Sequence, residues 1–327
     1  MIKMRYLISV LIWLSVSVGF SQSNQKLVVI KAGTLVDTEN GKLTKDQLIL
    51  IRGEKIDSVL PGTAKIPSDA AIIDLSGYVV SPGLIDCHTH MVDLQFASPA
   101  GPLEKSEAEY AFEGVRNAKA TLMAGFTSVR DVGTWRVFTD AALRDAINDG
   151  TVPGPRMQVA GTYVTTSSGS GDIAGIAHDI VLPPTLRFGV ANSADEVRQK
   201  VRELLNGGAD FIKIMATGAV LTMGTQPGVP EFSEAELRAA VVEAAKYGAQ
   251  VTSHAHGADG IKNAVRAGVQ SIEHGSLIDD EGIAMMKKQG TYLVADIYNG
   301  DYIADIGIKQ GWPAEHIRFF KTFWFIL

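Results

Sequence analysis

Five of the seven histidines in this 327-residue chain gather in three short stretches, and each stretch follows or ends an apolar run. The first stretch reads Gly83-Leu-Ile-Asp-Cys-His-Thr-His90. Side chains two residues apart on a strand point to the same side, so the imidazoles of His88 and His90 face one way. The pattern predicts two ligands for one metal ion, with two ordinary polar residues as the plain alternative.

The other two stretches repeat this arrangement. Val251-Thr-Ser-His-Ala-His256 presents His254 and His256 on one face. Ser271-Ile-Glu-His-Gly275 adds His274. A single histidine after a strand is usually structural, but histidines at three separate strand ends are hard to obtain by chance. Imidazoles in this number suit Zn²⁺ or a similar divalent ion.

A lysine accompanies the histidines. Lys213 lies inside the apolar run Phe211-Ile-Lys-Ile-Met215. Burial disfavours the charged ammonium and lowers its pKa, so the neutral amine could act as a base or nucleophile, or be carboxylated by CO₂. A lysine whose tip reaches solvent would need no such role. An anionic bridge would let two metal ions sit about 3.5–4 Å apart and share a hydroxide.

Composition places the chain among folded globular proteins. Hydrophobic residues make up 46% and charged residues 20%, which excludes a disordered or fibrous chain. The net charge of −6 argues against a nucleic-acid partner, because such proteins usually carry a basic excess. Cys87 is the one cysteine, so no intramolecular disulfide can form.

The first residues have the order of a secretory signal peptide. Basic residues lead into an apolar run from Tyr6 to Phe20, and Gly19 and Ser21 fit the small positions before a cleavage site. The run is short for a membrane span, which needs about 20 residues. We therefore expect a signal peptide over 1–21, no stable membrane span, and an exported protein, periplasmic or secreted.

Two domains are expected after this segment. Residues 22–80 contain short strand-like runs and an Asn40-Gly41 pair that predicts a tight hairpin, so we expect a small β domain there. From residue 81 onward strands alternate with helices, which predicts an α/β fold with a parallel sheet, doubly wound or closed as a barrel. The strand-like runs begin near seven residues: Leu84, Phe126, Met157, Phe211, Ala249, Val269 and Thr291.

Local signals mark several helix starts. Ser-x-x-Glu capping boxes predict helices that begin after Ser106, Ser193 and Ser233. No G-x-G-x-x-G motif follows the first strand of the parallel part, which weakens the dinucleotide-binding alternative.

The stretch Pro82–His90 resembles the metal-binding signature of the amidohydrolase superfamily. The order H-x-H, lysine, histidine, histidine is that of its binuclear subtype. Ala124–Gly133 and Gly154-Pro-Arg156 are similar to the prolidase-like and imidazolonepropionase-like branch. The resemblance covers about 26–315 and implies a metal-dependent hydrolase with a (β/α)8 TIM-type barrel, preceded by a small N-terminal β-sandwich domain.

The resemblance also implies roles for the metal ligands. The first two histidines hold the more buried of two divalent ions, carboxylated lysine bridges both ions, and two later histidines hold the second; the expected metal is Zn. These ligands are His88, His90, Lys213, His254 and His274.

Other residues are expected near the substrate. The first histidine of the fifth-strand motif is the ligand in the family, so His256 is expected to touch substrate instead. Arg130 and Asp131, after the second strand, either orient substrate or support the site, with a structural ion pair left equally open. His178 is expected to be an ordinary polar loop residue.

The chain departs from the family pattern twice. A Gly-Gly-His-Gly-Asp loop reads Ser168-Gly-Ser-Gly-Asp172 here. The eighth-strand Asp in a Gly-Thr-Asp setting, which ligates metal and moves the proton, has no counterpart; Asp296 is expected on the seventh strand and not to replace it, so the catalytic acid–base stays unassigned. We therefore expect a barrel over 81–327 without its last repeat, a small domain without its C-terminal strands, and an out-of-frame or truncated end at Phe319–Leu327. A chain made as written is expected to be poorly soluble and inactive.

The function that the resemblance implies is prolidase-like hydrolysis of a C–N bond in a dipeptide or an acylated amino acid, through a metal-bridging hydroxide. A hydrolase of a cyclic amide or lactone with the same fold is one alternative. An inactive or non-enzymatic metal-binding chain is another. The expected partner is a small-molecule or short-peptide substrate, and self-association as a homo-oligomer is left open.

Overall fold

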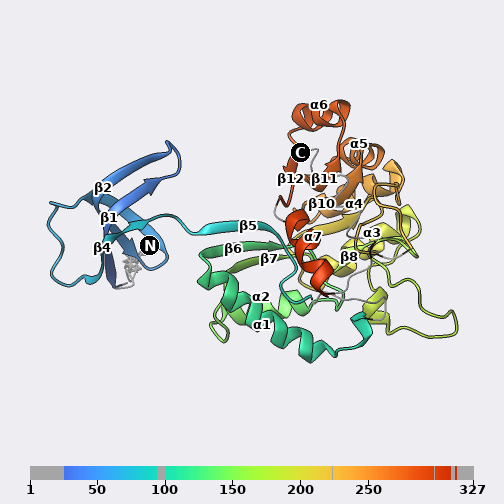
Figure 1. Cartoon of the computed structure of the whole chain (residues 1–327), viewed down its shortest axis with the longest axis horizontal. Helices are drawn as coiled ribbons and strands as arrows, with labels where there is room; N and C mark the ends of the chain where they lie inside the picture. The colour runs from blue at the N-terminus through green and yellow to red at the C-terminus, as the bar shows by residue number, and fades with distance from the viewer. Residues whose placement is uncertain (1–25, 94–100, 223, 298, 311–313, 315–327) are drawn as a thin grey trace, which may run out of the picture. The chain divides into compact units, whose positions relative to one another are not determined.

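The computed structural model describes residues 26–93, 101–222, 224–297, 299–310 and 314 (Figure 1). The predicted signal peptide and the aromatic-rich end at 319–327 lie outside the described residues. The chain divides after Pro82 into two compact units. Each unit is described separately below.

The small unit is a four-stranded sheet in the order β3-β2-β1-β4, made of β1 (Leu27–Asp37), β2 (Lys42–Arg52), β3 (Lys55–Pro61) and β4 (Ala71–Val80). β1 and β2 form an antiparallel hairpin whose turn places Gly41 at a φ of 64°, which confirms the hairpin that Asn40-Gly41 predicts. β4 pairs in parallel with β1. The strand-like runs of this segment form longer strands than expected, since β1 and β4 have 11 and 10 residues. The described residues of this unit form one sheet, so the second sheet of the expected sandwich is not among them.

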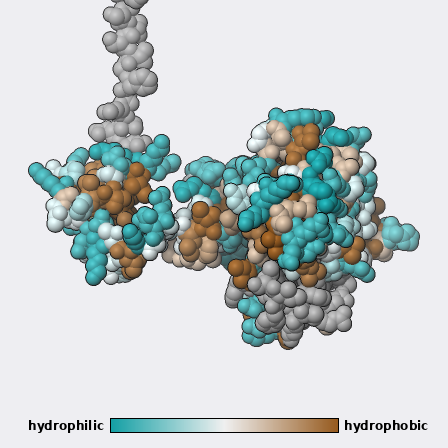
Figure 2. All heavy atoms as spheres, turned by 90° about the horizontal axis from the view of Figure 1, so that it is seen from above, coloured by the Kyte–Doolittle hydropathy of each residue, from teal (hydrophilic) through white to brown (hydrophobic). Residues whose placement is uncertain are grey.

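Few apolar side chains are buried in this sheet. Leu27, Val29 and Leu48 form its core. Other large apolar side chains stay exposed, among them Leu43 at 67% and Val79 at 65%, and hydrophobic surface is visible on this unit in Figure 2. A sheet this small buries little apolar area, so hydrophobic burial contributes little to its stability.

The large unit is built from parallel strands. β5 (Leu84–Thr89), β6 (Phe126–Asp131) and β7 (Arg156–Val159) pair in that order, and a second sheet runs β12-β11-β10-β9-β8. The second sheet contains β8 (Tyr163–Val164), β9 (Ile212–Met215), β10 (Val251–Gly257), β11 (Ser271–Leu277) and β12 (Tyr292–Val294). This confirms the predicted α/β fold with parallel strands. The single strand expected near Met157 is two strands, because the chain turns at Gly161 with a φ of 78° before it pairs with β9.

Helices follow the strands. They are α1 (Glu107–Met123), α2 (Thr139–Asn148), α3 (Ala194–Asn206), α4 (Glu234–Ala245), α5 (Ala258–Ala267), α6 (Asp280–Gln289) and α7 (Asn299–Gln310), with short 3-10 turns at Gly101–Leu103 and Pro184–Arg187. Among the described residues none of these helices is long and apolar enough to cross a bilayer.

The capping prediction is correct for two helices and half correct for the third. α1 and α4 begin with complete capping boxes at Ser106 and Ser233. At α3 the hydroxyl of Ser193 accepts from Glu196 N, but the Glu196 carboxylate accepts from Asn192 N instead of closing the box. Ser193 has a more extended φ of −155°, against about −70° at Ser233.

The main core lies between the second sheet and its helices. Its largest members include Leu204 of α3, Leu237 of α4 and Ile261 of α5, which are fully buried together with Ile212 and Ile214 of β9. Each such side chain contributes about 1.5–3 kcal/mol through burial. This packed layer holds the carboxyl ends of the strands in place, and these ends carry the polar side chains considered next.

Candidate metal centre

The structure brings the predicted histidines together at the carboxyl ends of the strands. The imidazole centroids of His88 and His274 lie 4.7 Å apart, and those of His254 and His274 lie 4.8 Å apart. His90 is 5.3 Å from His88, and His256 is 4.7 Å from His254. We call these five side chains the histidine cluster. They come from β5, its following residue, β10 and β11, which are far apart in the sequence.

Arg130 and Glu273 connect the two sheets beside this cluster. Arg130 of β6 donates to Ser271 Oγ at 3.0 Å and to Glu273 Oε1 at 2.5 Å, both on β11. Its Nε donates to Cys87 O at 2.8 Å. The sheets therefore curve around a shared interior, as a TIM-type barrel requires. These bonds occupy Arg130 with Glu273, so its placement fits support of the site better than direct contact with substrate.

Two site residues have left-handed backbones. His274 has a φ of 71° and Asp296 a φ of 53°. Such a conformation costs non-glycine residues about 1–3 kcal/mol and is concentrated at functional sites. The left-handed residue His274 lies inside β11, where the pairing with β10 shifts register, and Asp296 lies just beyond the end of β12.

Two groups of donors are close enough to hold an ion each. His254, His256 and His274 form one, and His88, His274 and Asp296 form the other; within each group the ligand atoms lie within 4.8 Å of one another. His274 belongs to both. These groups differ from the expected pairs in that they include His256 and Asp296.

Asp296 is a correction to the sequence interpretation. The sequence predicts it on the seventh strand, whereas β12 ends at Val294 and Asp296 lies two residues beyond it. Its Oδ2 is 3.7 Å from His274 Nδ1. An acid just past an apolar strand was the available signal, because that is where barrel sites form.

Second partners orient several imidazoles. His88 Nδ1 is 2.8 Å from Glu273 Oε2, and His90 Nδ1 is 2.7 Å from Gly133 O. His256 Nδ1 is 3.0 Å from Ser276 Oγ. A hydrogen bond at Nδ1 leaves Nε2 available to a metal, which is the usual arrangement around protein-bound ions. The sequence predicts no role for Glu273; the signal for one is an acid directly before His274 in a largely buried strand.

One buried nitrogen shows that the donor set fits a metal. His254 Nε2 is buried and has no hydrogen-bond partner among the described residues. Burying a polar atom without a partner lowers the stability of the fold by about 1–3 kcal/mol, so a buried atom of this kind indicates a bound group. An ion that accepts an imidazole lone pair satisfies this atom.

The electrostatics of the cluster favour the metal-binding forms. Burial, together with the nearby Lys213 and His88, lowers the pKa of His256 to about 3. Burial first, and then neighbouring cationic groups, hold the pKa of His254 and His274 well below the usual value. Neutral imidazole is the form that binds metal. The side chain of His90 is more exposed, at 37%.

Lys213 and Glu273 are two further ionisable side chains of the site. Lys213 is 2% exposed, and burial lowers its pKa to about 8 although Glu273 opposes the shift. Burial alone would raise the pKa of Glu273, but the His88 hydrogen bond and the charges of Lys213 and Arg130 hold it well below the usual range. Glu273 is therefore an anion, and Lys213 is closer than an ordinary lysine to the neutral amine that carboxylation requires.

The remaining predicted residues lie around this site. Asp131 is fully buried and accepts from Met91 N at 2.5 Å and from Gly133 N at 3.3 Å. It supports the loop after β5. His178 is exposed in the loop that follows β8.

Comparisons with known proteins find a matching family and similar sequences. The model of the amidohydrolase family matches residues 79–313. The chain is 31% identical to the ochratoxinase of Aspergillus niger over 84% of its own length and 60% of the relative's, so it spans about three fifths of that curated relative.

Solved structures are similar as well. A Xaa-Pro dipeptidase with bound methionine superposes with a TM-score of 0.85 at 34% identity, covering 91% of this chain and 74% of the other. A prolidase complexed with N-methylphosphonate-L-proline gives a TM-score of 0.83 at 32% identity, with 91% and 73% coverage.

Proposed function

Because this chain belongs to the amidohydrolase family, we propose that it is a metal-dependent hydrolase that cleaves C–N bonds. The observation that carries the proposal is the histidine cluster with its unpartnered His254 Nε2. Its imidazoles converge at the strand ends, where barrel enzymes form their sites, and the lowered pKa values of His254, His256 and His274 favour the neutral form that binds metal.

We assign two divalent ions, with Zn as the expected metal, to this site. The ligands proposed from the sequence are His88, His90, His254 and His274, with carboxylated Lys213 as the bridge. The donor groups of the structure add Asp296 and His256 as ligand candidates. When bound, such ions supply the Lewis acidity that amide hydrolysis needs.

The chain's own acids have different tasks in this proposal. Every oxygen of Glu273 is engaged, since Oε2 meets His88 while Oε1 accepts from Arg130, Ser271 and Thr252. Glu273 therefore orients His88. Asp296, beside His274, is the carboxylate we propose to accept and return the proton during hydrolysis.

The proposed substrate is a dipeptide or an acylated amino acid. Similarity to a Xaa-Pro dipeptidase and to a prolidase supports a dipeptide, and similarity to an ochratoxinase supports an amide hydrolase more broadly. Export to a periplasm or the medium and self-association remain predictions.

Two readouts test the proposal, the metal content and the hydrolysis of the purified protein. Metal content of the purified protein, measured by plasma mass spectrometry, is expected near two ions per chain. The purified protein is also incubated with a panel of dipeptides and N-acyl amino acids, and the released amine is measured. This release is expected to stop when a chelator is added and to return with Zn²⁺. Turnover that a chelator leaves unchanged would contradict the metal-dependent mechanism.

A further inference from the structure

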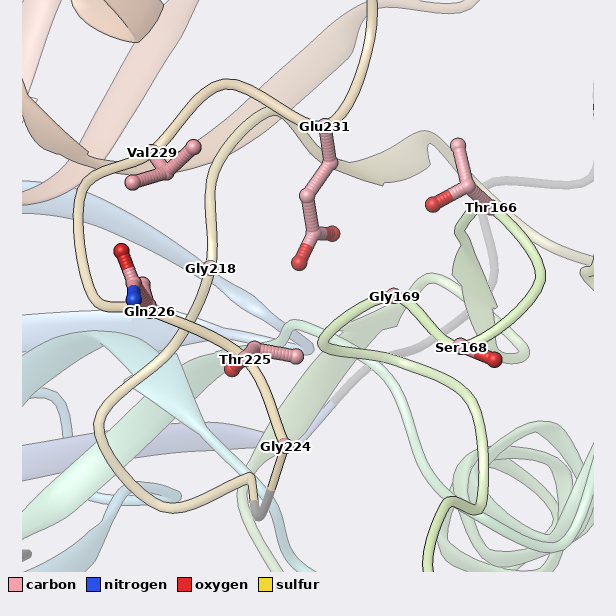
Figure 3. Close-up of a pocket in the computed structure, with 9 residues that line it drawn as sticks. All are labelled: Thr166, Ser168, Gly169, Gly218, Gly224, Thr225, Gln226, Val229 and Glu231. Atoms are coloured by element: carbon pink, nitrogen blue, oxygen red, sulfur yellow. The ribbon is translucent and has the colours of Figure 1, made fainter.

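A cavity of about 230 Å³ lies outside the histidine cluster (Figure 3). Its walls come from the loop that follows β8 and the loop that follows β9. The lining residues used below are Thr166, Gln226 and Glu231. The carboxylate of Glu231 points into the space between the two loops (Figure 3). No role was assigned to these residues from the sequence.

Glu231 is a partly buried acid without a cationic partner. Its carboxylate accepts from Ser170 N at 2.9 Å and from Ser170 Oγ at 3.0 Å. Within the ranges that the structure describes, no lysine, arginine or histidine forms an ion pair with it, and burial raises its pKa. Removing a carboxylate from water without a counter-charge is costly, so a cation in this cavity would be stabilised by it.

The cavity is connected to the candidate metal centre through the consecutive residues Ala216 and Thr217. The Thr217 hydroxyl accepts from His256 N at 3.1 Å. The backbone oxygen of Thr217 accepts from the Ser170 hydroxyl at 2.9 Å, and the Ser170 hydroxyl is also 3.0 Å from Glu231 Oε2. In addition, Ala216 O accepts from Glu231 N, while Ala216 N donates to His254 O, both at 2.9 Å. The loops of the cavity follow the carboxyl ends of β8 and β9, which belong to the same parallel sheet as β10 and β11, so the cavity lies at the same edge of that sheet as the histidine cluster.

We propose that this cavity is a subsite for a cationic group of the substrate, either an ammonium or a guanidinium. The inference rests on the proposed hydrolase function and adds a substrate class to it. Glu231 would supply the counter-charge, and the oxygens of Thr166 and Gln226 are polar partners for the remaining N–H groups. The charge comes either from a basic side chain or from the free amino terminus of a dipeptide.

Four probes separate these two sources by binding alone. They are lysyl-leucine, leucyl-lysine, norleucyl-leucine and N-acetyl-norleucyl-leucine, and calorimetry measures their dissociation constants with the Zn-loaded chain. At least one cationic probe is expected to bind about tenfold more tightly than the acetylated neutral one. In Glu231→Gln, which keeps an acceptor for Ser170, this preference should fall to about twofold or less. The control Glu234→Gln removes an equal charge from the nearby start of α4, and the preference for the cationic probe should remain about tenfold.

Each outcome has a clear meaning. Norleucyl-leucine binding more tightly than its acetylated form identifies the amino terminus, whereas a gain confined to the lysine probes identifies the side chain. Equal affinities, no binding of any probe, or a preference that survives in Glu231→Gln would overturn the subsite. Amine release measured in parallel keeps the two proposals apart, since hydrolysis without a charge preference defeats only the subsite, and a preference without hydrolysis defeats only the enzyme function.

Discussion

The large unit buries two clusters of titratable side chains, and they differ in how well their polar atoms are satisfied. The histidine cluster contains His254 Nε2, which is buried without a partner among the described residues. The second cluster, which we call the carboxylate cluster, consists of Asp93, Asp131 and Asp140. All three acids are buried or nearly so.

Every oxygen of the carboxylate cluster accepts a hydrogen bond. Asp140 accepts from Ala141 N at 2.8 Å and Gly161 N at 2.9 Å. Asp93 accepts from Thr134 Oγ1, Trp135 N and Tyr163 OH, at 2.6, 3.1 and 2.9 Å. Burial raises the pKa of Asp93 to about 7.

The comparison shows that burial of polar groups does not by itself mark a ligand site. Carboxylates whose oxygens all accept hydrogen bonds hold loops together. Converging imidazoles that include a buried nitrogen without a partner indicate a ligand site. The following variants test this distinction, from the largest expected effect to the smallest.

Lys213→Ala should have the largest effect. Loss of the bridging side chain is expected to lower the metal content from about two ions to below one and to reduce hydrolysis about 10³-fold or more. A small added carboxylate such as propionate should restore part of both. Lys119→Ala, at an exposed position of α1, is the matched control. Unchanged metal content in Lys213→Ala would contradict the bridging role.

Asp131→Ala should damage stability and leave the metal centre largely unchanged. The N–H groups of Met91 and Gly133 lose their acceptor, so the free energy of unfolding is expected to fall by about 4 kcal/mol. Urea denaturation measures this change, and metal content per folded chain should stay the same. Asp195→Ala, at a residue whose side chain is 94% exposed, should change stability little. Metal loss without destabilisation would place Asp131 with the histidine cluster instead.

Asp140→Asn should change the pH dependence of stability. Burial raises the pKa of Asp140 from 3.8 to about 6, so the folded state binds this proton more tightly than the unfolded state. Its contribution is complete below about pH 3.8 and is lost as the pH rises through about 6, which lowers the free energy of unfolding by about 2–3 kcal/mol. In Asp140→Asn, this decrease in the free energy of unfolding should be absent. Urea midpoints between pH 4 and 7 measure it, and parallel profiles for both proteins would refute the assignment.

His256→Ala should give the smallest effect. We expect it to keep the metals and to weaken substrate binding about tenfold, because it shares a face with His254 while other side chains supply the predicted ligands. Metal analysis and substrate affinity measure the two parts separately. Ser276→Ala, which removes only the Nδ1 partner of His256, should give a smaller change. If His256→Ala loses metal, then the donor group that contains His256 is the true ligand set.

Local patterns predicted much of the large unit. Apolar runs followed by histidines located the ends of β5, β10 and β11, and complete capping boxes located the starts of α1 and α4. These features depend on neighbours within a few residues, which is why a sequence carries them. The division of the third strand at Gly161 was not predicted, because pairing with β9 decides it.

The sequence by itself determined which donors exist and on which strands they lie: five clustered histidines, Lys213 in an apolar run, and the strand–helix alternation that collects strand ends at one edge. Only the tertiary structure decided which donors meet. Asp296 and Glu273 became parts of the site because a left-handed turn follows β12 and because the two sheets curve until Arg130 reaches β11. The Glu231 cavity likewise exists only where two loops face each other. Periodicity is a property of adjacent residues, whereas sheet curvature and loop contacts depend on packing between segments far apart in the chain.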